Sequence, residues 1–347
     1  MNRMNVLDAS AQQLARTRWN AIAKPLHSLG RLEDLIVQIA GIQESADVEL
    51  NPRCALVFCA DHGVLAEGVT QSGSDVTALV AQSIVEQNAN INLMAAAVKT
   101  DVYAVDMGML VDVPGTIRCK TCNGTQNMAN EPAMKRLEAE QAVQAGVELV
   151  GEMKKRGYRM IATGEMGIGN TTASTALACA LLSLQPKELT GRGAGLSDEG
   201  LLRKQKVIQQ ALSMHRPDPQ DPLDVLGKVG GFEIAGMTGA FLGGMKYRVP
   251  VVIDGVISAV SALLAARIAP ESKAFMLPSH MSREPAAKRI MGELGMEPMI
   301  YADLALGEGT GAVTLFPLLD MAYAVYTGTH TFGSLGMDAY TAQGGNI

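Results

Sequence analysis

The segment RMIATGEMGIGNTTASTALACALL, residues 159–182, decides the fold. Residues 159–164 predict a short buried strand, and residues 173–182 predict a helix that is apolar on nearly every side. The loop between them is rich in glycine and ends in amide and hydroxyl side chains suited to helix caps. Free N–H groups and the helix dipole at such a helix start favour an anion. Because the loop lacks the Walker and dinucleotide spacings, it predicts either a generic phosphate site or a capped turn without a ligand.

Strand and helix patterns alternate along the chain from residue 54. Near-continuous apolar strands that alternate with helices are typical of a doubly wound α/β fold, with a mainly parallel sheet and helices on both faces. The expected strands span residues 55–59, 101–106, 160–163, 251–253 and 274–277. The expected helices span residues 10–23, 32–43, 74–86, 91–98, 131–156, 172–184, 200–213, 232–246, 258–268 and 285–294.

Several polar side chains follow the expected strands, where doubly wound sheets bind their ligands. They are Asp61, His62, Glu165, Asp254 and His280. Exposure of loop starts to solvent would explain each of them separately. Together with the glycine-rich loop, they favour a single cleft at one edge of the sheet.

The segment ALGEGTGAVT, residues 305–314, sets Glu308 among three glycines on an apolar background. Each glycine would weaken a regular helix by about 1 kcal/mol, so the segment predicts a sharp turn or a close approach to a ligand. Desolvation of a carboxylate at this position would raise its proton affinity, as a general base at neutral pH requires. A glycine-rich turn with an exposed glutamate is the alternative.

The overall composition limits the classes of function. The chain has 347 residues, of which 48% are hydrophobic, and its formal net charge of −6 argues against a nucleic-acid surface. The apolar stretches at residues 230–245 and 249–269 contain charged side chains, so neither predicts a membrane span. We expect no signal peptide, because the first residues contain no apolar run, and five cysteines suit a reducing, cytoplasmic compartment.

The cysteine and histidine spacings predict no metal site. Cys119 and Cys122 form a C-x-x-C pair, but no second pair or histidine cluster would complete a zinc site. We expect both to be structural or incidental thiols.

Several long motifs occur in an order typical of one enzyme family. They are SLGRLE at 28–33, CADHGV at 59–64, GEMGIGNTT at 164–172, DVLGKVGGF at 224–232, IDG at 253–255 and LGEGTG at 306–311. From about residue 24 to residue 319 the chain resembles nicotinate-nucleotide:dimethylbenzimidazole phosphoribosyltransferases, a family that includes relatives activating phenol or p-cresol. The resemblance adds a small helical domain to the expected fold. It assigns residues 1–45 to the N-terminal helices of that domain, residues 46–320 to a Rossmann-like catalytic domain and residues 321–347 to a segment joining the small domain.

The resemblance implies a pentosyltransferase of cobamide biosynthesis that needs no cofactor. Phosphoribose would pass from nicotinate mononucleotide to a lower-ligand base, 5,6-dimethylbenzimidazole or similar. Inversion would give an α-ribotide, α-ribazole phosphate, and release nicotinate. Transfer to the oxygen of phenol or p-cresol, as one subunit of a heteromer, is an alternative, and a silent regulatory paralogue is another. The resemblance favours a homodimer, with a heterodimer of paralogues as the alternative. The charge and the apolar stretches indicate no nucleic-acid or membrane partner.

By the same resemblance, Glu308 would be the general base, and Glu165 would be a second carboxylate that contacts ribose or supports the developing oxocarbenium charge. The expected nucleotide-binding residues are Gly167, Ile168, Gly169, Asn170, Lys204, Ser279 and Ser282. The alternatives are a solvated helix face for Lys204 and simple loop caps for the two serines.

The resemblance also outlines an acceptor pocket. Its expected residues are Ser72, Gly73, Val76, Leu79, Val80, Met166 and Leu306. Members of the family usually carry proline where this chain has Gly73, and often glutamine where it has Leu79. A looser, more apolar wall could admit a smaller or less nitrogenous acceptor.

Overall fold

The computed structural model describes residues 6–341. The chain divides into two compact units, one made of residues up to 50 with those from 315 onward, and the other made of residues 51–314. Residues 1–5 and 342–347, the outer ends of the expected small domain, lie outside the described residues. That the small unit is a separate domain stays a prediction.

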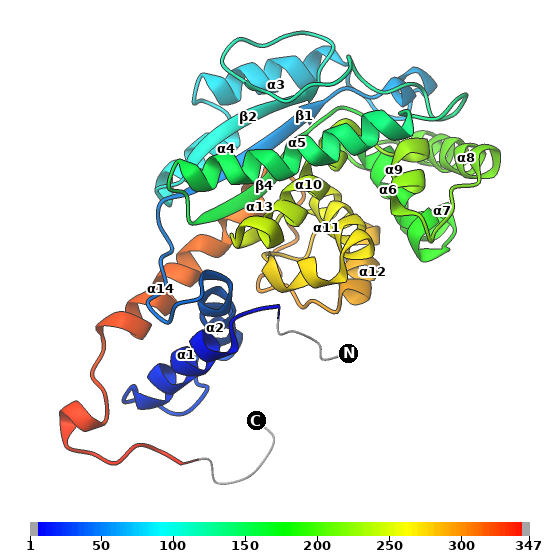
Figure 1. The fold of residues 1–347 in the computed structure, drawn as a ribbon. Coiled ribbons are helices and arrows are strands. Elements are labelled where there is room, and N and C mark those ends of the chain that lie inside the picture. Colours follow the sequence, from blue (N-terminus) through cyan, green and yellow to red (C-terminus); the bar gives the residue numbers. More distant parts are fainter. Residues whose placement is uncertain (1–5, 342–347) are drawn as a thin grey trace. The chain divides into compact units, whose positions relative to one another are not determined.

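The larger unit is built on a six-stranded sheet with the order β3-β2-β1-β4-β5-β6. Every neighbouring pair of these strands runs parallel, and this order is the doubly wound one, with its reversal between β1 and β4 (Figure 1). The strands are β1 (Arg53–Ala60), β2 (Asp101–Gly108), β3 (Ile117–Arg118), β4 (Met160–Met166), β5 (Val251–Ile253) and β6 (Met276–Pro278). The expected fold class is confirmed.

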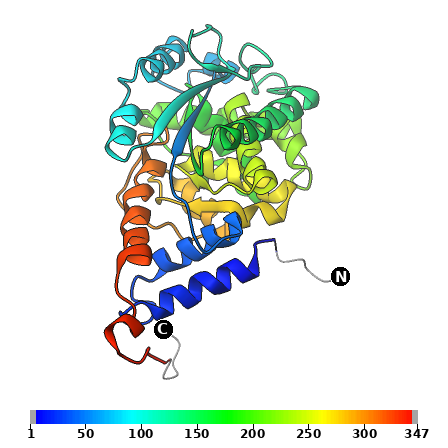
Figure 2. The same cartoon turned by 60° about the vertical axis from the view of Figure 1, so that its left-hand side comes forward.

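Helices cover both faces of this sheet. The α-helices of the unit are α3 (Asp75–Val85), α4 (Asn90–Ala97), α5 (Arg136–Lys155), α6 (Asn170–Leu182), α7 (Pro186–Leu189), α8 (Asp198–His215), α9 (Pro222–Val229), α10 (Phe232–Tyr247), α11 (Val256–Ile268), α12 (Pro285–Leu294) and α13 (Thr310–Val313). The 3-10 helices are η1 (Gly63–Glu67) and η2 (Pro270–Phe275). The connections from β1 to β2 and from β4 to β5 run in opposite directions along the sheet. Right-handed crossovers therefore place α3 and α4 on the face opposite α10 (Figure 2).

Two strands differ from the sequence prediction in a way that matters for the site. β4 continues through Glu165 and Met166, which pair with Phe58 and Cys59 of β1, so Glu165 projects from the strand itself and not from the following loop. β6 begins only at Met276, because the preceding residues form η2. The short elements β3, α7, α9 and α13 are not among the strands and helices expected from the sequence.

Helix α10 is packed tightly between the sheet and α5. It contacts β1, β2 and β4 on one side and α5 along its length on the other. Glycines make this approach possible, since a methyl group at Gly239 would overlap the Val143 carbonyl oxygen of α5, and one at Gly146 would overlap the Gly236 carbonyl oxygen. Many of the chain's 36 glycines therefore serve close helix packing as well as turns.

The smaller unit contains α1 (Ala9–Ala21), α2 (Arg31–Gln43), α14 (Leu315–Gly328) and the 3-10 helix η3 (Gly333–Leu335). Trp19 and Tyr326 bring their ring centroids within 5.0 Å, and the Tyr326 hydroxyl donates to the Ala46 carbonyl oxygen at 2.8 Å. Asp8 caps α1, and α1 begins one residue before the expected Ser10. Among residues 6–341, no helix combines the length and the hydrophobicity that a membrane span would need.

Replacement of Gly239 by alanine should destabilise the chain, because the new methyl group would press on the α5 backbone. Overpacking of this kind costs about 1–3 kcal/mol, and urea unfolding should show it as a lower midpoint. Gly292→Ala is the control, since Gly292 lies in helix α12 with open space around the added methyl. It should match or exceed the wild-type stability. Equal midpoints for the two variants would contradict the close packing of α5 on α10.

Candidate active site

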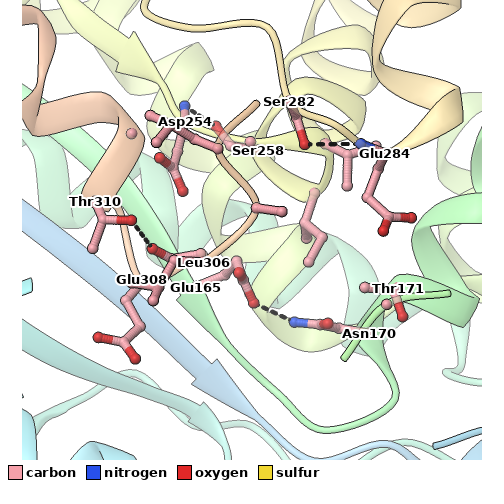
Figure 3. A pocket seen from close by; sticks show the side chains of 18 of the residues that line it. Glu165, Asn170, Thr171, Asp254, Ser258, Ser282, Glu284, Leu306, Glu308 and Thr310 are labelled. Atoms are coloured by element: carbon pink, nitrogen blue, oxygen red, sulfur yellow. Dashed lines mark hydrogen bonds between the residues drawn. The ribbon is translucent and has the colours of Figure 1, made fainter. Parts of the chain in front are cut away.

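A cavity lies beyond the carboxyl ends of β4, β5 and β6, where the sequence predicted a cleft (Figure 3). Predicted site residues that line it include Glu165, Met166, Gly167, Ile168, Asn170, Ser282, Leu306 and Glu308. Asp254, His280, Thr171 and Glu284 also line it. The cavity therefore collects side chains from segments that are far apart in the sequence.

Glu165 is buried at the end of β4, with its side chain toward this cavity. The Asn170 side-chain amide donates a hydrogen bond to its Oε2. Burial raises the pKa of Glu165 to about 8, the negative charge of Asp254 adds to the rise, and the hydrogen bond from Asn170 opposes it. Near neutral pH this carboxyl group therefore holds a proton more firmly than an ordinary glutamate.

The Glu308 segment turns through three consecutive residues with positive φ. The angles are 90° at Gly307, 60° at Glu308 and 87° at Gly309. Glycine adopts this left-handed conformation at little cost, whereas for Glu308 it is uncommon and needs support from its surroundings. The predicted sharp turn is thus present, and its flanking glycines are required by the backbone.

The turn lies directly against the backbone of β4. A methyl group at Gly164 would come within 2.5 Å of the Glu308 carbonyl oxygen, so glycine is needed on the strand as well. Asp254, just after β5, fastens the turn from the other side. Its carboxylate accepts hydrogen bonds from the N–H groups of Gly309, at 3.2 Å, and Ala312, at 2.8 Å.

Glu308 is half-buried and lines the same cavity as Glu165, and Figure 3 shows its carboxylate directed away from that of Glu165. Its Oε2 accepts a hydrogen bond from the Ile91 N–H at 3.3 Å. Burial raises the pKa of Glu308, hydrogen bonds from Ile91 and the Asn90 side chain lower it, and the charge of Asp254 raises it. Within the part of the chain that the structure describes, neither Glu165 nor Glu308 forms an ion pair, so both carboxyl groups remain available to a ligand.

The glycine-rich loop after β4 forms another wall of the cavity. Gly169, with φ of 101°, takes the N-cap position of α6, and no side chain caps that helix. The prediction that an amide side chain caps α6 is wrong, because the Asn170 side chain bonds Glu165 instead. The His62 side chain packs against this loop at Gly167 and Gly169. Its Nε2 lies 2.8 Å from Oε1 of buried Glu233.

Lys204 is fully buried in helix α8, contrary to the alternative of a solvated helix face. Its Nζ donates to Thr171 Oγ1 at 2.8 Å. Burial lowers the pKa of Lys204 to about 8, and the charge of Glu284 opposes this. Lys204 lines a smaller second cavity that shares Gly167, Ile168, Gly193 and other residues with the first.

The two predicted serines have different environments. Ser282 lines the main cavity. Ser279 is buried away from its lining, and its hydroxyl donates to the Ile253 carbonyl oxygen at 2.5 Å. Ser279 therefore joins β6 to β5 in this structure.

Some of the predicted acceptor residues line the cavity and others do not. Met166 and Leu306 line the cavity. The lining does not include Ser72, Gly73, Val76, Leu79 or Val80, and Leu79 is 61% exposed. Helix α3 still adjoins the site, because Thr77 Oγ1 accepts from the Ile168 N–H at 3.2 Å. The assignment of those α3 residues to an acceptor stays a prediction.

Among residues 6–341, no group of three or more His, Cys, Asp and Glu side chains is arranged to hold a metal ion. Cys119 and Cys122 are free and partly buried. Asp254 and His280 lie at the cavity as their positions just after expected strands indicated, whereas Asp61 and His62, expected at the same cleft, do not line it. No sequence signal indicated the bond between Ile91 and Glu308, because only the tertiary fold brings these residues together.

A doubly wound sheet with a glycine-rich loop and two carboxyl groups at its switch-point edge is typical of nucleotide-binding α/β enzymes. A family model described as phosphoribosyltransferase matches residues 4–337. The nicotinate-nucleotide–dimethylbenzimidazole phosphoribosyltransferase of Ruminiclostridium cellulolyticum is 42% identical over 342 residues, covering 98% of this chain and 97% of that protein. The enzyme of the same name from Roseiflexus sp. is 43% identical, with 96% of each chain covered.

Solved structures agree with these relatives. The crystal structure of CobT from Thermus thermophilus matches with a TM-score of 0.89 and 39% identity, over 95% of this chain and 99% of that one. The chain belongs to this phosphoribosyltransferase family, and the resemblance seen in its motifs is confirmed.

The raised pKa of Glu165 predicts a specific pH dependence of stability. The folded chain keeps a proton that the unfolded chain loses above pH 4.5, so this residue's contribution to the free energy of unfolding declines as pH rises from 4.5 to about 8. The decline is at most about 1.4 kcal/mol per pH unit. Glu165→Gln should remove this decline. The free energy of unfolding of the variant, measured with urea, should therefore increase relative to that of wild type as pH rises.

The matched control is Glu131→Gln, which changes an exposed glutamate. It should leave the pH dependence unchanged. A Glu165→Gln curve parallel to that of wild type would show that Glu165 titrates as an ordinary carboxylate.

Proposed function

We propose that this chain transfers phosphoribose from nicotinate mononucleotide to 5,6-dimethylbenzimidazole or a similar lower-ligand base, and releases nicotinate. The product is an α-ribotide, because attack from the side opposite nicotinate inverts the anomeric carbon. The relatives carry this activity in their names, which favours a benzimidazole over a phenolic acceptor and an enzyme over a silent paralogue.

The chemistry needs a base and a well-placed donor. The nicotinate ring of the donor is cationic, so the bond from its nitrogen to C1′ can break as the ring leaves with the electron pair. An acceptor nitrogen attacks C1′ with its own lone pair, and the acceptor ring then loses an N–H proton. Glu308 is the group proposed to take that proton, since it is half-buried and lines the cavity on a turn that Asp254 holds.

Glu165 is proposed to face the ribose. Its buried carboxyl group holds a proton firmly in the free chain, but a cationic donor next to it favours the ionised form. An ionised Glu165 would then stabilise the positive charge that develops on the ribose as nicotinate leaves. The hydrogen bond from Asn170 fixes the carboxylate in place.

The phosphate is proposed to bind where the two cavities join. The Gly167–Asn170 loop lies there at the start of α6, with Lys204 next to Thr171 and Ser282 on the neighbouring wall. Backbone N–H groups at a helix start and a buried ammonium group both favour an anion. We also propose a dimer of identical chains in the cytoplasm as the working form.

The observation that carries this proposal is the common cavity of Glu165, Glu308 and the glycine-rich loop. The test is to incubate the purified chain with nicotinate mononucleotide and a panel of benzimidazoles, purines and phenols. Nicotinate release and the mass of the product are measured. We expect an α-ribotide with 5,6-dimethylbenzimidazole. Failure of every acceptor in the panel to release nicotinate would overturn the proposal, and a phenolic product alone would move it to the oxygen-linked reaction.

Glu308→Gln tests the role of the base in the same assay. Loss of general base catalysis lowers kcat by about 10²–10⁴-fold, while the affinity for nicotinate mononucleotide should stay near that of wild type. Glu131→Gln should behave as wild type. Substantial residual turnover in Glu308→Gln would assign the proton to another group.

A further inference from the structure

Gly255 lies between β5 and α11, on the wall of the main cavity. We infer that its missing side chain keeps a subsite open, in which Ser282 and His280 bind a hydroxyl group of the ribose in the donor nucleotide. The inference rests on the proposed function, since it takes nicotinate mononucleotide as the donor. It gives a ligand-binding role to a glycine that the proposed chemistry leaves without one.

Neither the backbone nor the packing around Gly255 requires glycine. Its φ of −79° and ψ of −159° are extended, a conformation open to any residue. Beyond its two chain neighbours, a methyl group there would lie at least 3.8 Å from the other atoms of residues 6–341, an ordinary contact distance. At Gly311, which also lines the cavity, a methyl group would instead come within 1.9 Å of the His280 ring. Gly255 therefore leaves room for a ligand.

Two polar side chains border this room. Ser282 Oγ lies 3.8 Å from the position that a methyl group at Gly255 would take, and His280 Nε2 lies 4.0 Å from it. Both side chains belong to residues that are more than nine-tenths buried, and both residues line the cavity. A ligand atom in that room can come within hydrogen-bond distance of either one.

The contacts of His280 decide which hydrogen-bonding group it presents. Ser279 Oγ donates its hydrogen to the Ile253 carbonyl oxygen at 2.5 Å, so it offers only lone pairs to His280 Nδ1, 3.1 Å away. Nδ1 therefore carries a hydrogen, and Nε2 of the neutral ring presents a lone pair. Burial lowers the pKa of His280, which favours the neutral ring, and the charge of Asp254 opposes this shift. His280 Nε2 thus accepts a hydrogen bond from a ligand.

Ser282 presents a hydroxyl group beside this acceptor. Its oxygen accepts from the Glu284 N–H at 3.4 Å (Figure 3). Within the described part of the chain, its own hydrogen meets no acceptor, so it is free to donate to a ligand. A ligand hydroxyl group can donate to His280 and accept from Ser282, and the pair therefore suits such a group.

The charges around this subsite favour a neutral ligand group. Asp254 and Glu284 line the same cavity, whereas Lys204 lines the adjoining one. A phosphate dianion or the nicotinate carboxylate would be repelled by the two carboxylates and has no hydrogen to donate to His280. The ribose hydroxyl groups are the neutral donors of nicotinate mononucleotide. Glu165, which is proposed to face the ribose, lines this cavity too.

The simpler alternative is that Gly255 serves the start of α11, where it takes the N-cap position. Glycine favours that position more than alanine does, and serine favours it at least as much as glycine. A capping role therefore predicts that Gly255→Ser behaves as wild type. A ligand-binding role predicts that serine impairs binding as much as alanine does, because each side chain occupies the space.

The experiment measures the affinity for nicotinate mononucleotide by titration calorimetry, without an acceptor, in wild type, Gly255→Ala, Gly255→Ser and Gly292→Ala. Gly292→Ala is the matched control, since its methyl group also has open space but lies in α12, outside the lining of the main cavity. Both Gly255 variants should bind about 10–100-fold more weakly than wild type, and the control should bind equally well. Wild-type affinity in Gly255→Ser would overturn the inference, whatever the result for alanine.

A second titration identifies the ligand group that binds. It compares nicotinate mononucleotide with its 2′-deoxy and 3′-deoxy analogues in wild type and Ser282→Ala. Wild type should bind one analogue about five- to tenfold more weakly than the parent nucleotide, and Ser282→Ala should reduce this difference. Equal affinity of wild type for all three nucleotides would overturn the inference. An equal loss for all three in Ser282→Ala would assign the serine to another part of the nucleotide and would overturn it as well.

Both titrations are independent of turnover, so they separate the inference from the proposed function. A hydroxyl preference that Ser282→Ala reduces, in a chain that releases no nicotinate with any acceptor, would keep the subsite and overturn the proposed function. Normal turnover together with unchanged binding in the Gly255 variants would do the reverse. A chain that does not bind nicotinate mononucleotide would contradict both.

Discussion

The site depends on one close approach between two backbones. The turn of Gly307, Glu308 and Gly309 lies against β4 at Gly164, where a methyl group would come within 2.5 Å of the Glu308 carbonyl oxygen. This contact brings Glu308 to the same cavity as Glu165, which follows Gly164 on the strand. Asp254 fixes the turn from β5 through two backbone N–H groups. Backbone contacts with the sheet, and not flexible loops, therefore fix the positions of the two carboxyl groups, as a preorganised site requires.

The second constraint is electrostatic. Glu165, Glu308 and Asp254 share a partly desolvated crevice, and burial raises the pKa of each. Such a site is unfavourable when all its carboxyl groups are ionised, and a cationic ligand relieves the repulsion. A donor with a positively charged ring fits this environment, whereas the released nicotinate has lost that charge. Lys204, which lines the adjoining smaller cavity, is the basic group proposed to bind the phosphate.

Much of this arrangement could be predicted from the sequence, because local patterns encode it. The alternation of apolar strands and helices indicated the doubly wound sheet, and the glycines around Glu308 indicated a sharp turn. Other features depend on tertiary contacts that no local pattern reveals. Lys204 lies in a run of basic and polar residues, yet it is fully buried. Ser279 looked like a ligand-binding loop residue, but its hydroxyl bonds the end of β5. The Ile91 N–H reaches Glu308 only because α4 and α13 pack together.

The most direct measurement is a crystal structure of the chain with the α-ribotide product bound. The account predicts that the base of the product lies beside the Glu308 carboxylate and that its ribose lies at Glu165. The phosphate should lie between the loop after β4 and Lys204. A product seated with its base away from Glu308, or with its ribose outside the cavity shared by Glu165 and Glu308, would contradict the account.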